Sequence, residues 1–172
     1  MSDRFAHQLR LDQLRDGERL DLVADESERG AIAKRLDLVS LERLEAHVCL
    51  ERAGDVVRAT GRLLASLDQS CVVTGDPVAA HVDEAFSLIF LPEPRDAADE
   101  EIELGEADCD TVFYDGAAID LGTALADTLA LNLDPYPRSA AADAELKEAG
   151  VLTEEQASPF AVLAKLMKSD EA

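Results

Sequence analysis

Alternating apolar and polar positions predict an antiparallel sheet in the first half of the chain. Three runs carry the two-residue period of half-buried strands, and they span residues 44–51, 56–67 and 78–91. Turn sequences around Gly54 and Gly75 separate the three runs. Because these connections are too short for a parallel crossover, the strands are expected to form an antiparallel meander. In the third run the apolar parity shifts near Glu84, which predicts a bulge or a change of register.

The opening of the chain is predicted to be a unit of two strands and one helix. Residues 5–14 and 19–23 are interpreted as strands, and Asp16 and Gly17 form a turn sequence of the hairpin type between them. Asp25 is a candidate N-cap for a helix that follows.

Leucines at four-residue spacing predict a helix in the second half. Leu121, Leu125 and Leu129 share one helical face, Asp120 is placed to cap its start, and Pro135 ends it. A short strand is expected before it at residues 111–114.

The end of the chain predicts a further helix. Ser158 is its candidate cap and Pro159 occupies the first helical position. Its apolar face comprises Phe160, Leu163, Leu166 and Met167.

Together these elements predict an α+β fold: an antiparallel sheet, as a meander or a partly closed barrel, with flanking helices and a C-terminal helical tail. We expect an α+β domain at residues 1–138, a polar linker at 139–157 and a helical motif at 158–172. Within the domain, residues 92–110 hold nine acidic residues and one arginine, and like charges at that density favour a solvated, mobile loop.

Charge narrows the choice of partner. The chain of 172 residues carries 37 acidic and 16 basic side chains, a net charge of −21. Direct binding of RNA or DNA generally needs a lysine and arginine footprint, so basic proteins are the expected partners. Acidity that serves only solubility is the plain alternative. A basic face for direct RNA binding remains open, since many arginines lie early in the chain: Arg10, Arg15, Arg19, Arg35, Arg43, Arg52, Arg58 and Arg62.

Candidate chemistry is sparse. Cys49, Cys71 and Cys109 are too few and too widely spaced for a disulfide framework, which fits reduced thiols in the cytoplasm. No apolar stretch is long enough for a signal core or a membrane span. We therefore expect a cytoplasmic protein without membrane partners.

Enzymatic motifs are not recognisable either. The sequence holds no phosphate-binding loop, zinc-protease motif or serine-hydrolase motif, so we expect no enzyme, no cofactor and no small-molecule substrate. A zinc site built from Cys71, His81, Cys109 and a carboxylate lacks the paired ligand spacing of known sites. A metal-dependent hydrolase using carboxylates remains the remote alternative.

Four segments, taken in order, carry a family resemblance. They are the turn at 71–74, the acidic loop, the block 118–121 with the following 131–137, and the Ser-Pro-Phe-Ala-Val-Leu sequence that begins at Ser158. In this order they resemble the bacterial YceD-like family of large-subunit ribosomal RNA accumulation proteins. The resemblance implies a role in ribosome biogenesis with no established catalytic activity.

One position departs from the family pattern. Many members carry a C-x-x-C turn where this chain has Cys71 and Thr74. A hydroxyl cannot replace a thiolate in a paired zinc knuckle, so no metal is expected. Thr74 and Asp76 are expected to hold the turn through local backbone bonds.

The resemblance and the charge together predict the partners. We expect contact with a basic ribosomal protein or a large-subunit assembly intermediate, and with ribosomal RNA directly or indirectly. The alternative role of the C-terminal helix is packing on its own domain. The candidate contact residues are Phe160, Leu163, Lys165 and Leu166, followed by Tyr136 and Arg138.

Overall fold

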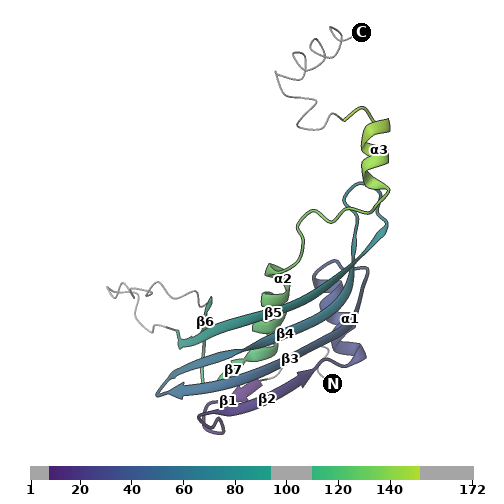
Figure 1. Cartoon of the computed structure of the whole chain (residues 1–172). Helices are drawn as coiled ribbons and strands as arrows, with labels where there is room; N and C mark the ends of the chain where they lie inside the picture. Colours follow the sequence, from purple (N-terminus) through teal and green to yellow (C-terminus); the bar gives the residue numbers. More distant parts are fainter. Residues whose placement is uncertain (1–7, 94–109, 152–172) are drawn as a thin grey trace, which may run out of the picture. The chain divides into compact units, whose positions relative to one another are not determined.

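Figure 1 shows the chain as a computed structural model, which describes residues 8–93 and 110–151. The described residues fall into two compact units, one of residues 8–69, 79–93 and 110–135, the other of residues 70–78 and 136–151. The elements are β1 (Gln8–Arg10), β2 (Glu18–Val23), α1 (Glu26–Arg35), β3 (Ser40–Ala53), β4 (Val56–Ser70), β5 (Pro77–Pro92), β6 (Asp110–Tyr114), β7 (Ala118–Asp120), α2 (Leu121–Leu131) and α3 (Ala142–Glu148).

The main sheet of the first unit is open. Its five strands run in the order β2-β3-β4-β5-β6, so β3, β4 and β5 are neighbours as the meander requires. The α+β prediction is confirmed, whereas the partly closed barrel is wrong, because β2 and β6 form two separate edges. The pairs β2–β3 and β3–β4 are antiparallel, and β5–β6 is parallel.

Side-chain parity places one face of the sheet in the core. Leu44, Ala46, Val48 and Leu50 of β3 are all buried, as their alternation predicts. The predicted parity shift in β5 is wrong. Its buried residues Phe86, Leu88 and Phe90 continue the parity of Val82, because the large side chains fill the core while Glu84 and Ala85 stay exposed.

The predicted N-terminal hairpin is also wrong. β1 does not pair with β2 but with β7, in the register Gln8↔Asp120 to Arg10↔Ala118. Leu11 and Leu14, in the connection to β2, enter the core instead. The turn at Gly17 is held against the main sheet, where its N–H donates to the carbonyl of Leu50 at 2.8 Å, and the positive φ of 75° there suits a glycine.

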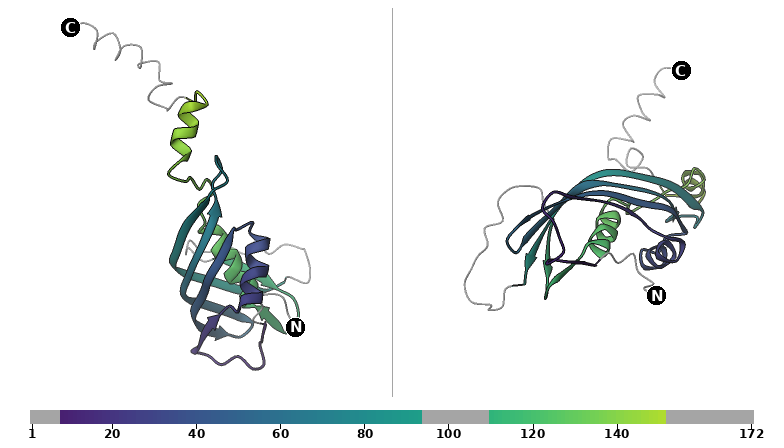
Figure 2. Two further views of the ribbon diagram at one scale, coloured as in Figure 1. Left: turned by 90° about the vertical axis from the view of Figure 1, so that its right-hand side faces the viewer. Right: turned by 90° about the horizontal axis from the view of Figure 1, so that it is seen from below.

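Two helices cover the inner face of the curved sheet, as the right-hand view of Figure 2 shows. α1 begins with a capping box in which Asp25 accepts from the N–H of Glu28 at 2.8 Å and Glu28 accepts from the N–H of Asp25 at 3.0 Å. Asp120 caps α2 as predicted, accepting from the N–H of Thr123 at 2.9 Å. Leu121, Leu125 and Leu129 are fully buried.

None of the helices in the described ranges is long and apolar enough to cross a membrane.

Candidate functional site

The predicted contact residues divide into two groups. Phe160, Leu163, Lys165 and Leu166 lie outside the described residues, so their role stays a prediction. Tyr136 and Arg138 lie in the second unit and are exposed, with 70% of Tyr136 accessible. Their role as contact residues also stays a prediction, but their surroundings are defined.

Tyr136 and Arg138 flank a backbone position that is fixed by hydrogen bonding. Pro137 between them is buried, and its carbonyl oxygen accepts from the N–H of Val72 at 2.9 Å. We call residues 70–78 and 136–139 the clasp, since this bond joins two stretches that are distant in sequence. The clasp orients Tyr136 and Arg138 outward from a fixed backbone.

The thiol of Cys71 is the centre of the clasp. Its Sγ accepts from the N–H of Ser139 at 3.2 Å and from the N–H of Thr74 at 3.5 Å, and its side chain is buried. Burial by itself raises the pKa of the thiol, but the donors from Thr74 and Ser139 outweigh it and lower the pKa to about 6. The clasp therefore stabilises a thiolate at neutral pH.

Thr74 completes the turn in the predicted way. Its hydroxyl donates to a carboxylate oxygen of Asp76 at 2.8 Å, and the N–H of Asp76 donates to that hydroxyl at 3.2 Å. The hydroxyls of Thr74 and Ser139 lie 3.2 Å apart. The expectation that Thr74 and Asp76 hold the turn by local bonds is confirmed.

The clasp does not fit a zinc ion. Its ligands of the types that structural zinc takes are one thiol, Cys71, and one carboxylate, Asp76, whereas such a site needs four thiolate, imidazole or carboxylate ligands. Among residues 8–93 and 110–151, no group of three or more His, Cys, Asp or Glu side chains is placed to hold a metal. His81, a candidate in the zinc alternative, lies 3.2 Å from the hydroxyl of Ser66, and Cys109 lies outside these ranges.

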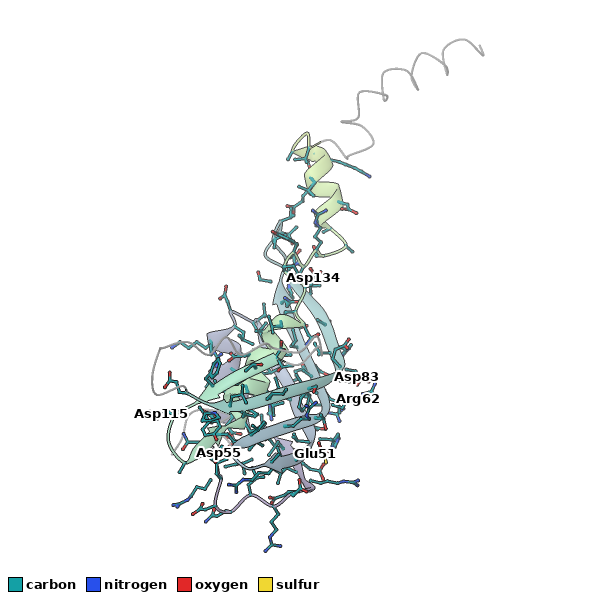
Figure 3. All side chains as sticks on the ribbon, turned by 90° about the vertical axis from the view of Figure 1, so that its left-hand side faces the viewer. Glu51, Asp55, Arg62, Asp83, Asp115 and Asp134 are labelled. Atoms are coloured by element: carbon teal, nitrogen blue, oxygen red, sulfur yellow. The ribbon has the colours of Figure 1, made fainter. Side chains whose placement is uncertain are left out.

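Half of the eight arginines considered for RNA binding are engaged within the protein. Four of them form ion pairs with carboxylates, and they lie on four different elements. The pairs are Arg10–Asp12 at 2.8 Å, Arg43–Glu45 at 2.6 Å, Arg35–Asp127 and Arg62–Asp83, of which Figure 3 labels the last. Hydrogen bonding to its arginine partner lowers the pKa of Asp12 and of Glu45. These cations are compensated within the protein.

A groove opens in the first unit beside the sheet edge. It encloses about 680 Å³ and is lined from β1, β5, β6, β7 and α2. Its apolar lining includes Val112 and Phe113 of β6, together with Phe90 and Ile119, which are fully buried in the core. Phe113, 51% exposed, and the exposed Asp115 lie at its opening. We call this feature the groove.

The groove was missed from the sequence. Residues 111–114 were recognised as a strand, but Phe113 occupies the parity opposite to the buried Tyr114. A large aromatic side chain at an exposed strand position was the one available signal. The lining contributed by β1 had no signal, because the partner of β1 was unknown.

The protein is thus a strongly acidic α+β protein with an open mixed sheet, a hydrogen-bonded clasp and a groove at the sheet edge. Residues 59–167, more than half of the chain, match the family model described as Large ribosomal RNA subunit accumulation protein YceD. The chain belongs to the YceD family, which confirms the resemblance. The matched range contains the whole clasp and most of the groove. Neither the curated proteins nor the solved structures contain a match.

Proposed function

We propose that this protein is a non-enzymatic ribosome-biogenesis factor that supports accumulation of large-subunit ribosomal RNA through contacts with basic proteins. The family description supports the process. The charge distribution supports the mode of action, and it is the observation on which the proposal depends.

The charge argument compares two partners. A polyphosphate gains affinity when free lysines and arginines replace its counterions, and here Arg10, Arg35, Arg43 and Arg62 are already paired with carboxylates. A basic protein meets an excess of acidic groups, since the net charge is −21. Complementary charge accelerates association and suppresses wrong partners, so the acidic surface favours a basic protein over naked RNA.

The clasp supplies a candidate contact point for that partner. Tyr136 and Arg138 are exposed on a backbone that Val72 fixes through Pro137, and Tyr and Arg are the residue types that most often dominate interface energetics. Phe160, Leu163, Lys165 and Leu166 are proposed as a second contact, an amphipathic segment that inserts in a groove of the partner.

Affinity purification from cells tests the proposal. Tagged full-length protein, the 1–157 truncation and a Tyr136→Ala/Arg138→Ala variant are compared at low and high salt. Large-subunit assembly intermediates or their basic proteins should accompany the full-length protein at low salt, less so at high salt, and less with either variant. A Val23→Ala variant, exposed on β2, is the control.

Two results would overturn the proposal. One is tight, salt-resistant binding of the purified protein to naked ribosomal RNA, since that would mean direct RNA contacts that outweigh the repulsion between phosphates and the acidic surface. The other is catalytic turnover of RNA by the purified protein in the presence of magnesium, which would reinstate the hydrolase alternative.

A further inference from the structure

The geometry points to the groove as the docking site for a basic peptide segment that carries an apolar anchor residue. This inference rests on the proposed function, because it names the surface with which the protein holds a basic partner. It differs from the contacts proposed above, since no residue of the clasp is among the described residues that line the groove.

The groove offers apolar surface that an anchor residue can contact. Val112 is partly buried and Phe113 is exposed, whereas Phe90 and Ile119 are 0% exposed and belong to the core behind this lining. Phe113 at the opening leaves half of its side chain accessible. The volume of about 680 Å³ lies in the range of ligand sites, roughly 300–1,000 Å³, and accommodates one or two large apolar side chains.

The charged side chains of the lining are predominantly acidic. Asp115, Asp120 and Asp127 line the groove against a single cation, Arg10. Arg10 is neutralised by Asp12, whose carboxylate lies 2.8 Å away. Asp120 is engaged in capping α2 and Asp127 in pairing with Arg35, which leaves the exposed Asp115 as the foremost carboxylate for an incoming lysine or arginine. Figure 3 labels Asp115.

A second source of negative charge is attached to the same edge. Residues 92–110 hold nine acidic side chains and one arginine, and this stretch is joined at its two ends to β5 and β6. Phe90 of β5 and Phe113 of β6 both line the groove. The most acidic part of the chain is therefore tethered to the strands that form the groove, so a basic segment is attracted to this edge before it binds.

Other occupants fit less well. RNA would meet the same carboxylates without a free cation to offset them. A second copy of this chain would bring a further net charge of −21 to the contact, which opposes association. A basic, partly apolar segment is complementary in both charge and polarity.

Peptide binding to the purified full-length protein tests the inference. The probe is a short fluorescent peptide of alternating lysine and leucine, with a lysine–serine and a glutamate–leucine peptide as matched probes. Fluorescence anisotropy is measured for the wild type, Phe113→Ala and Asp115→Lys. Each substitution should weaken binding of the lysine–leucine peptide by about tenfold, the effect of losing one central contact, and both matched probes should bind less tightly to the wild type.

Two matched variants separate the groove from general electrostatics. Val23→Ala removes an exposed apolar side chain on β2, and Glu42→Lys makes the same charge change as Asp115→Lys at an exposed site on β3. Neither should change the affinity. The inference is overturned if the controls weaken binding as much as the groove variants, or if neither groove variant weakens it while urea midpoints show that both are folded.

Three further measurements complete the test. Replacing residues 95–108 by a glycine–serine linker should lower the association rate constant of the peptide and leave its dissociation rate constant nearly unchanged, because long-range charge acts mainly on the association rate. The purified protein is also tested for self-association and for binding of single-stranded RNA. If Phe113→Ala abolished either of these, the groove would belong to that occupant and the inference would be overturned. In the affinity purification, the wild type and the groove variants are compared. If both retain the same basic partners, the proposed function stands and the groove is not the docking site. If the peptide binds at the groove but no assembly partner accompanies the protein from cells, the proposed function is refuted instead.

Discussion

Replacement of Gly61 by alanine should be among the most destabilising single-methyl changes in this protein. Gly61 lies in β4 opposite Val48 of β3. A Cβ atom at this position would overlap the carbonyl oxygen of His47 and stand 3.0 Å from Cζ of Phe86. The first contact is with backbone, so no side-chain rotation relieves it. The two strands must separate locally, in the middle of the long β3–β4 pair.

The expected cost follows from two contributions. Overpacking in a well-packed core costs about 1–3 kcal/mol. Local separation of β3 from β4 removes one or two ladder hydrogen bonds at about 1 kcal/mol each. The free energy of unfolding should therefore fall by about 4 kcal/mol, a large part of the ~5–15 kcal/mol of a typical domain. For a chain of this size the corresponding fall in Tm is roughly 8–16 °C.

Urea and thermal denaturation followed by circular dichroism measure this difference. The matched control is Gly30→Ala in α1, where a Cβ meets nothing within 4 Å. Because alanine is the better helix former, Gly30→Ala should stabilise the protein by about 0.5–1 kcal/mol. The close approach of the strands would be refuted if Gly61→Ala unfolded at the same urea concentration as the wild type, or later.

Three other substitutions probe the core, the sheet edge and the clasp. Leu125→Ala removes a fully buried side chain of α2 and should lower the free energy of unfolding by about 2–5 kcal/mol; a loss below that range in urea denaturation would contradict the packing. Tyr114→Phe removes the bond from the phenol to the carbonyl of Asp55 at 2.5 Å, at a cost of about 1 kcal/mol. It should also abolish the high-pH component of the tyrosine absorbance titration, since burial raises the pKa of Tyr114; persistence of that component in the variant would show that it does not arise from Tyr114. The pKa of Cys71 falls from the ordinary 9.0 to about 6 on folding, so stabilisation by its thiolate is complete above about pH 9 and is lost as the pH drops through about 6. The wild type should therefore lose its stability advantage over Cys71→Ser between pH 9 and 6, and a pH-independent difference would exclude the thiolate.

Local sequence patterns were sufficient to predict the individual strands, helices and turns. Alternation in β3 placed Leu44, Ala46, Val48 and Leu50 on the buried face, because a strand repeats every two residues regardless of its neighbours. Leucine spacing and a capping aspartate located α2 within a few residues, since both signals act within one helical turn. Even the bonds between Thr74 and Asp76 were accessible, as they span two residues.

Pairing between strands that are distant in sequence could not be predicted from such local patterns. A hairpin turn sequence at Gly17 favoured pairing of β1 with β2, but Leu11 and Leu14 gain more by entering the core, and β1 pairs with β7 instead. The groove depends on that pairing and on the parallel β5–β6 contact, so it could not be foreseen. Likewise, the bond from the N–H of Ser139 to the Cys71 thiol joins residues with no common motif between them.

The pairing of β1 with β7 also delays the folding of the first strand during synthesis. Gln8–Arg10 leaves the ribosome early, yet its partner Ala118–Asp120 is translated more than a hundred residues later. At elongation rates of roughly 5–20 residues per second, that interval lasts on the order of 5–20 s. During it, the β3–β4 pair can already close locally while β1 has no partner strand. Throughout this time the backbone groups of β1 are open to mispairing with a neighbouring nascent chain.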